Sequence, residues 1–286
     1  MKSKTLCSSL GFVSGLVFAA GLFAQTPPIE FPSPSPASTL KQHIGLTDIE
    51  IVYSRPGMKG RAIFGGLVPY GAVWRTGANA STKISFSTRV KLNDTEVPAG
   101  KYALYTIPDE KEWTVIIYKD TAASIFNYNQ TNDLMRIKAV PVKLAEPVET
   151  FTIDINDIRD DSATLNLVWE KTRVPVKLAV DLVSTLVPQI EAVMAGPGDK
   201  KPYYPAAMFY FDHGLDLQKA SKWIDAAIAE RETYYIVHLK AKIRAKLGDK
   251  EGAIAAAKRS TELAIKAEGP KSGYVKMNED LISSVH

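Results

Sequence analysis

An alternation of apolar and polar residues with a period of two constrains this chain more than any other feature of its sequence. Ile49, Ile51 and Tyr53 begin the pattern, which returns in the runs 83–88, 102–107, 113–118, 134–140, 151–155, 163–169 and 174–182. Such alternation is typical of β-strands that bury one face. Turn-forming residues separate the runs, for example Asn93-Asp94 and Pro108-Asp109. The pattern predicts an antiparallel β-sandwich over residues 40–183 and disfavours a parallel βαβ fold.

The period changes in the last third of the chain. Residues 185–195 end at a Gly-Pro-Gly turn, which predicts a helix, and the chain beyond Pro205 is rich in Ala, Leu and Lys at helical spacing. Gly214 and Gly248 lie 34 residues apart, which is about the period of tetratricopeptide helical hairpins. The consensus Trp and Pro of those repeats are missing. We therefore predict a small all-α domain over residues 184–286 that resembles a tetratricopeptide hairpin, with a plain helical bundle as the alternative.

The first 24 residues have the composition of a secretory signal peptide. Two lysines form a short basic start, residues 10–23 are apolar or small, and Ala24 precedes the expected cleavage site. The apolar run is shorter than the roughly 20 residues that span a bilayer, so we expect cleavage of residues 1–24 and no membrane span afterwards. Residues 25–39 contain five prolines among Ser and Thr and predict an extended linker. The mature chain is then exported, and is either periplasmic or secreted.

Composition limits the partners of the mature chain. Cys7 is the only cysteine, so the exported chain forms no disulfide. Loss of the two signal-peptide lysines reduces the 35 Lys and Arg residues to 33, against 31 Asp and Glu. Because nucleic acids require clustered basic charge, this nearly neutral balance argues against a nucleic-acid partner.

The segment 53–79 gathers aromatic and basic side chains without one acidic residue. Its blocks YSRP, IFGGLVPYG and VWRTGAN, with PAGKYAL and EWTVIIYKD further on, resemble those of a family of secreted bacterial proteins, the domain of unknown function 2911 family. The resemblance extends over about residues 40–185. It implies an extracytoplasmic β domain, and it carries neither an activity nor a catalytic residue.

The same segment supplies the candidate ligand site. A guanidinium group offers a fixed fork of donors for carboxylate, phosphate or sulfate, and tyrosine and tryptophan rings pack against sugars or other rings. We therefore predict a pocket for an anionic small molecule or a glycan, formed by Tyr53, Arg55, Arg61, Trp74, Arg75 and Asn79. The alternative is that the arginines pair with acidic residues of neighbouring strands and bind no ligand.

No catalytic or metal-binding motif accompanies this segment. The four histidines are scattered, without metal-ligand spacing and without a G-x-S-x-G motif for a serine nucleophile. The acidic residues at 154–161 lack the glycine and the distal glutamate of a calcium-binding loop. We therefore expect no metal and no cofactor.

These patterns predict an α+β chain of two domains, an antiparallel β-sandwich followed by a small helical-hairpin domain. The favoured function is a non-catalytic binding or scaffolding module of the cell envelope, with a ligand at the β domain and a protein partner at the helices. The alternative is a hydrolase or lyase of envelope polymers with an Arg/Tyr/Trp pocket, in which Tyr53 or Tyr102 acts as acid or base. A purely structural role is the third hypothesis, and the residues leave open whether the chain is an enzyme.

Overall fold

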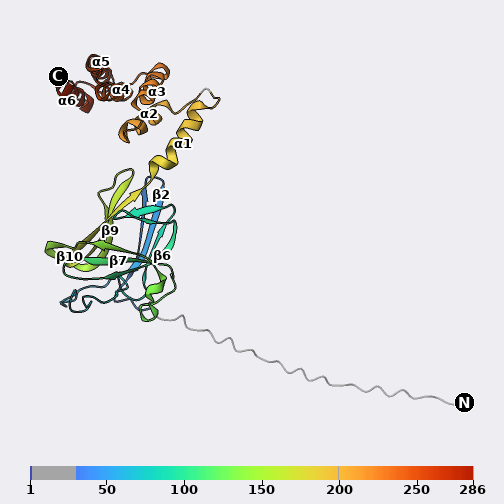
Figure 1. Ribbon diagram of the computed structural model, residues 1–286, viewed down its shortest axis with the longest axis vertical. Coiled ribbons are helices and arrows are strands. Elements are labelled where there is room, and N and C mark those ends of the chain that lie inside the picture. The colour runs from blue at the N-terminus through green and yellow to red at the C-terminus, as the bar shows by residue number, and fades with distance from the viewer. Residues whose placement is uncertain (2–29, 199, 286) are drawn as a thin grey trace.

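The computed structural model describes Met1 and residues 30–198 and 200–285. Apart from Met1, the predicted signal peptide and the first residues of the predicted linker lie outside this part. Ten strands precede six α-helices in the described residues. Figure 1 shows the strands gathered in one part of the molecule and the α-helices in another. The strands are β1 (Ala37–Ile44), β2 (Thr47–Ser54), β3 (Thr82–Phe86), β4 (Val90–Leu92), β5 (Thr95–Val97), β6 (Gly100–Ile107), β7 (Trp113–Tyr118), β8 (Asp133–Ala139), β9 (Val142–Asn156) and β10 (Ser162–Val180).

The strands form two antiparallel sheets. The six-stranded sheet has the order β1-β2-β3-β6-β7-β8, and the four-stranded sheet has the order β5-β4-β10-β9. Apolar residues on the inward face of both sheets pack into one core, as expected for a sandwich. The predicted antiparallel β-sandwich is therefore confirmed.

Three strands extend further than the sequence pattern indicates. β9 begins at Val142, well before the predicted run 151–155. β1 begins at Ala37, three positions before the expected start of the domain, because it pairs with β2 along its whole length. β10 is one strand of 19 residues where the alternation predicts two runs. Its pairing with β9 continues through register shifts on both sides of Glu170, whose φ is +53°. A bulge of this kind keeps a strand continuous while it redirects the side chains.

An aromatic cluster fills part of the core between the sheets. Trp74 stacks on Trp169 with ring centroids 5.8 Å apart, and its ring lies 5.0 Å from that of Phe151. Phe64 packs edge-on against Trp113 at 4.8 Å. Since Phe64 and Trp74 come from the long loop between β2 and β3, their rings anchor this loop to both sheets.

The helical domain follows directly after β10. Its helices are α1 (Leu182–Ala195), α2 (Tyr203–Asp212), α3 (Leu217–Glu230), α4 (Tyr234–Lys246), α5 (Lys250–Glu268) and α6 (Gly273–Val285). The chain turns after α2 at Gly214 and after α4 at Gly248, where φ is +63° and +82°. Glycine adopts this left-handed conformation at little cost, so both helices end where the sequence predicts. The predicted all-α domain is confirmed.

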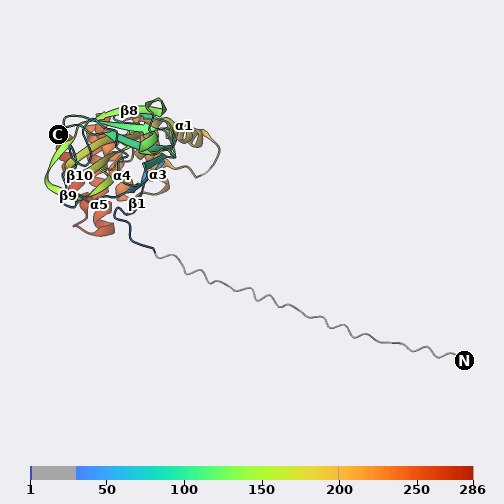
Figure 2. The same ribbon diagram turned by 90° about the horizontal axis from the view of Figure 1, so that it is seen from below.

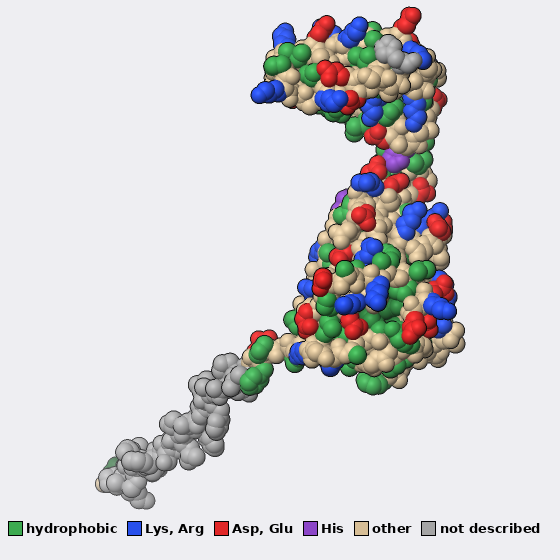
Figure 3. Space-filling model, turned by 90° about the vertical axis from the view of Figure 1, so that its left-hand side faces the viewer, with side chains coloured by type: hydrophobic (Ala, Val, Ile, Leu, Met, Phe, Trp, Pro, Cys, Tyr) green, Lys and Arg blue, Asp and Glu red, His purple; other side chains and the backbone are tan. Residues whose placement is uncertain are grey.

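The helices extend beyond one end of the sandwich and cover neither face of a sheet (Figures 1 and 2). A narrow waist joins the two domains in Figure 3. At this junction Nε2 of His213 lies 3.0 Å from Oδ2 of Asp160, and Phe209 packs against the sandwich core. Lys and Arg side chains alternate with Asp and Glu on the face that Figure 3 shows. Among the helices described, none is long and apolar enough to cross a bilayer.

Candidate functional site

Two of the six residues predicted to bind a ligand are buried in the sandwich. Tyr53 is 4% exposed, and its hydroxyl donates to the carbonyl of Ile153 at 3.3 Å and accepts from the amide of the same residue at 3.0 Å. Trp74 is 9% exposed, and its indole N–H donates to the carbonyl of Gly77 at 3.0 Å. These bonds satisfy the polar atoms of both side chains, which hold the β2–β3 loop and the two sheets together.

The arginines of the segment are bonded to main-chain carbonyls and a hydroxyl instead of carboxylates. The guanidinium of Arg55 donates to a carbonyl and a threonine hydroxyl of β9, at 3.1 and 2.7 Å. The guanidinium of Arg61 donates to two carbonyls of its own turn, at 2.9 and 2.7 Å. Arg75 is half-buried and has no polar side-chain partner in the described part of the chain. The three guanidinium groups are therefore neither locked to acids nor gathered around one cavity.

Asn79 holds the residues just before β1 against the sandwich. Its side-chain amide donates to the carbonyl of Ser35 at 3.1 Å and to the hydroxyl of Ser54 at 3.3 Å. The amide of Arg55 donates to the carbonyl of Pro36 at 2.9 Å beside it. Asn79 thus positions the start of β1 on the sandwich.

Only two of the six predicted residues border a hollow. Trp74 and Arg75 line a depression of about 230 Å³ together with Leu67 and Phe126, and the Phe126 side chain is 93% exposed. The role of the six residues in ligand binding stays a prediction.

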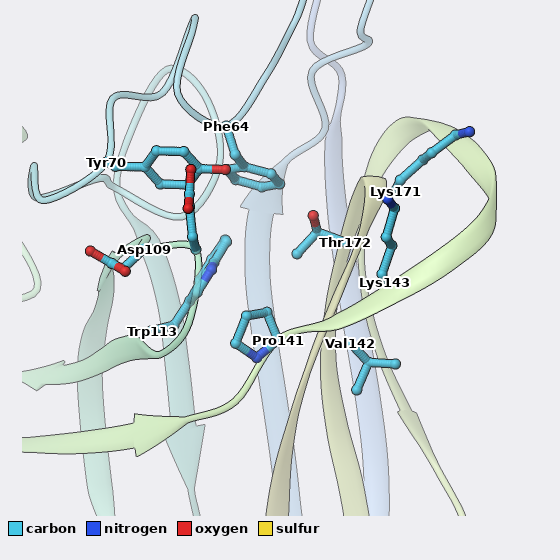
Figure 4. Close-up of a pocket in the computed structure, with 10 residues that line it drawn as sticks. Phe64, Tyr70, Asp109, Trp113, Pro141, Val142, Lys143, Lys171 and Thr172 are labelled. Carbon is cyan, nitrogen blue, oxygen red and sulfur yellow. The ribbon is translucent and has the colours of Figure 1, made fainter.

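A larger hollow, of about 380 Å³, lies between the β2–β3 loop, the β6–β7 turn and the β9–β10 pair. Phe64, Tyr70 and Trp113 give it an aromatic surface, and we call it the aromatic hollow. In Figure 4, Tyr70 and Asp109 lie on one side, Lys143 and Lys171 lie on the other, and Thr172 lies between them. Its volume is within the range of small-ligand pockets, which are about 300–1,000 Å³.

The local backbone explains why these side chains meet. Gly65 has a φ of +82°, and a Cβ atom there would lie 2.8 Å from the ring of Tyr70, so only glycine lets this ring lie against the loop. On the opposite side, the bulge at Glu170 precedes Lys171 and Thr172, and Thr172 pairs with Lys143 in the sheet. Bulges are common next to functional sites because they redirect side chains.

The Tyr70 hydroxyl lies in a negative environment. Burial raises its pKa, and the carboxylates of Glu110, Glu170 and Asp109 raise the pKa further, because they oppose the phenolate charge. The hydroxyl therefore stays protonated at neutral pH and is available as a hydrogen-bond donor. The hollow combines aromatic faces with donors and acceptors, which suits the binding of a small polar molecule.

The residues proposed for acid or base chemistry have other partners. Tyr53 is bonded to β9 as described above, and the Tyr102 hydroxyl donates to the carbonyl of Pro98 at 3.0 Å. Burial raises the pKa of Tyr102 as well, so it is a weak acid at neutral pH. Within residues 30–198 and 200–285, no group of three His, Asp or Glu side chains is arranged to hold a metal ion.

None of the six residues predicted to bind a ligand lines the aromatic hollow. Phe64 and Tyr70 belong to the same segment 53–79, whereas the sequence pattern predicts Asp109 only as a turn residue and gives no signal for Lys143. The detectable signal is the polar run 170–173, which interrupts two apolar alternating runs without a Gly or an Asn to make a turn. The missing turn residue is the one sequence feature that sets this interruption apart from a loop between two strands.

A two-sheet antiparallel β domain with a surface hollow, followed by helical hairpins, defines the class of this protein. The family model described as "Protein of unknown function (DUF2911)" matches residues 35–178, so the chain belongs to this family. The match spans the β domain and stops within β10. Comparison with the curated proteins gives no match, and comparison with the solved structures gives none either.

Proposed function

We propose that this protein is an exported, non-catalytic binding module of the cell envelope, and that its β domain takes a small polar ligand in the aromatic hollow. The observation that carries the proposal is the composition of this hollow, where three aromatic side chains lie beside four charged ones. Aromatic rings supply contact area for a sugar or another ring, and the charged groups fix its orientation.

The hydrolase or lyase alternative is less well supported. General acid or base chemistry requires a group within hydrogen-bond reach of the substrate whose pKa lies near the working pH. The hydroxyls of Tyr53 and Tyr102 are bonded to main-chain groups, and both side chains are buried. The pKa of Tyr70, which does reach the hollow, is raised by burial and its acidic neighbours, away from neutral pH. The tyrosines therefore supply no acid or base for this alternative, and we assign the carboxylates of Asp109 and Glu110 in the hollow to ligand binding.

The first prediction concerns where a ligand binds. We expect N,N′-diacetylchitobiose, a neutral disaccharide, to raise the stability of the protein, because a ligand specific for the folded state adds RT ln(1 + [L]/Kd), about 2.7 kcal/mol at 100 times Kd. Isothermal titration calorimetry measures the affinity. Tyr70→Ala should weaken binding at least about tenfold, since it removes a ring and a donor worth over about 1.4 kcal/mol.

Phe126→Ala is the matched control for that prediction. It removes an aromatic side chain that is 93% exposed on the same domain and lines the hollow of Arg75. Unchanged affinity in this variant supports the aromatic hollow. If Phe126→Ala abolishes binding and Tyr70→Ala does not, the site lies at Arg75 instead.

The second prediction concerns export. We expect the intact mass of the protein from a bacterial envelope fraction to correspond to a chain that begins at Gln25, because signal peptidase cleaves after small residues such as Ala24. A mass that includes residues 1–24 would contradict cleavage. Substitution of Ala24 by a bulky residue should prevent the processing.

The helical domain is proposed to contact a protein partner. A groove of about 390 Å³ lies between α3, α4 and α5. The cations at this groove are already paired within the domain, for example Arg244 with Asp225 and Asp249, and Arg259 with Glu232. We therefore expect such a partner to contact mainly the uncharged part of the groove.

A further inference from the structure

The aromatic hollow has walls of opposite charge. Asp109 and Glu110 come from the turn between β6 and β7, and Lys143 and Lys171 come from β9 and β10 on the other side. Figure 4 shows the two lysines separated from Asp109 by the middle of the hollow. All four side chains are exposed to solvent. The hollow therefore presents a negative and a positive side to any molecule that enters it.

These four charges are unpaired within the described residues. Asp109 accepts only from the amide of Lys111, at 3.3 Å, and no ion pair involves the other three side chains. The neighbouring residues behave differently, because Lys138 and Glu112 form an ion pair at 2.9 Å just outside the hollow. Unpaired charges of both signs around one hollow are consequently a local feature of this site.

The fold keeps the two sides apart. Lys143 is fixed by its pairing opposite Thr172, and Lys171 follows the bulge at Glu170. The acidic side is held by a short turn that ends at Trp113, a residue that is 2% exposed and anchored in the core. Between the two sides the surface is formed by Phe64, the edge of Trp113 and Thr172. A ligand that spans the hollow would meet an apolar middle with charges at both ends.

We propose that the aromatic hollow takes a zwitterionic ligand with an apolar or ring-bearing middle, such as a short peptide with free ends or an amino-bearing sugar acid. Its ammonium group binds Asp109 and Glu110, and its carboxylate binds Lys143 and Lys171. This inference rests on the proposed function, since it specifies the ligand class of the same site. Each charged end of the ligand therefore contributes to the affinity separately, and capping one end removes that contribution.

The test uses the dipeptide L-Phe-Gly and two capped forms, N-acetyl-Phe-Gly and Phe-Gly-amide, titrated calorimetrically into the whole protein. We expect the free dipeptide to bind about three- to fivefold more tightly than either capped form, because each cap removes one charged contact between solvent-exposed groups. The Lys143→Gln/Lys171→Gln variant should bind the free dipeptide and Phe-Gly-amide equally well, and should still bind the free dipeptide more tightly than N-acetyl-Phe-Gly. The Asp109→Asn/Glu110→Gln variant should bind the free dipeptide and N-acetyl-Phe-Gly equally well, and should still bind the free dipeptide more tightly than Phe-Gly-amide.

Lys138→Gln/Glu112→Gln is the matched control, because it removes one lysine and one acid that pair outside the hollow. This variant should bind all three peptides as the unaltered protein does. Equal affinity for the free and capped peptides overturns the zwitterion inference. If the disaccharide binds and no form of the dipeptide does, the inference fails and the proposed function stands. If neither binds, both fail.

Discussion

Replacement of Trp74 by alanine is expected to destabilise the β domain by about 3–5 kcal/mol, which is typical for the loss of a buried aromatic side chain. The ring of Trp74 stacks on Trp169 and contacts Phe151 and Phe64, so its loss would leave a cavity between the two sheets. Its indole N–H also closes the turn at Gly77. In the variant, the β2–β3 loop should lose this anchor, and the free energy of unfolding of the β domain should decrease.

Urea unfolding followed by tryptophan fluorescence measures this effect. All compared proteins should carry Trp223→Phe, because Trp223 lies in α3 and its fluorescence would report on the unfolding of the helical domain. Arg75→Ala is the control at the next position, and we expect it to change the free energy of unfolding by less than about 1 kcal/mol, since the Arg75 side chain has no polar partner among the described residues. A Trp74→Ala protein of unaltered stability would show that Trp74 is not the core residue described above.

Acid is expected to destabilise the helical domain through His238. This side chain is 8% exposed, and Nδ1 lies 2.7 Å from the side-chain oxygen of Asn278, whose amide donates to the Ser260 hydroxyl. Burial lowers the pKa of His238 below its ordinary value of 6.5, and the nearby charge of Lys242 lowers the pKa further. The unfolded chain therefore takes up a proton at a higher pH than the folded chain.

The sign of the pH dependence follows from this difference. The contribution of His238 to the free energy of unfolding is fully present above about pH 6.5. It falls as the pH decreases from there towards the lowered pKa of the folded state, because only the unfolded chain binds a proton at this histidine in that pH range. Guanidinium unfolding followed by circular dichroism at 222 nm, at pH 7.5 and pH 5.5, measures the loss. His238→Gln should reduce the difference between the two pH values. His43→Gln, which alters an exposed histidine of β1, should not change it.

Asn278→Ala should cost about 2–4 kcal/mol at pH 7.5, because it leaves the buried Nδ1 of His238 without a partner, removes the donor to the Ser260 hydroxyl and opens a cavity among α4, α5 and α6. Asn278 is completely buried, so water cannot replace its amide without structural change. A cost below about 0.5 kcal/mol would contradict the structural role of this network.

The sequence predicts the fold well because the determinants of the fold are local. Alternation with a period of two identifies the strands, and Gly214 and Gly248 mark the helix ends. The pattern fails at β10, since the polar residues 170–173 resemble a loop when read alone. Their place in the strand depends on pairing with β9, a contact that no local pattern contains.

The candidate site is harder to predict for a physical reason. Tyr53 and Trp74 have the chemistry of ligand-binding side chains, but their burial is decided by the packing of two sheets. The aromatic hollow combines residues from the β2–β3 loop, the β6–β7 turn and two strands, which become neighbours only in the folded chain. Composition singles out the loop that contributes Phe64 and Tyr70 to the hollow, and it carries no information on the charged side chains opposite.

A crystal structure of the protein with bound L-Phe-Gly tests the central claim most directly. The account predicts the dipeptide in the aromatic hollow, with its ring against Phe64 and Tyr70 and its ammonium group within hydrogen-bond distance of Asp109 or Glu110. A dipeptide bound beside Arg75, or anywhere else with the aromatic hollow empty, would contradict it.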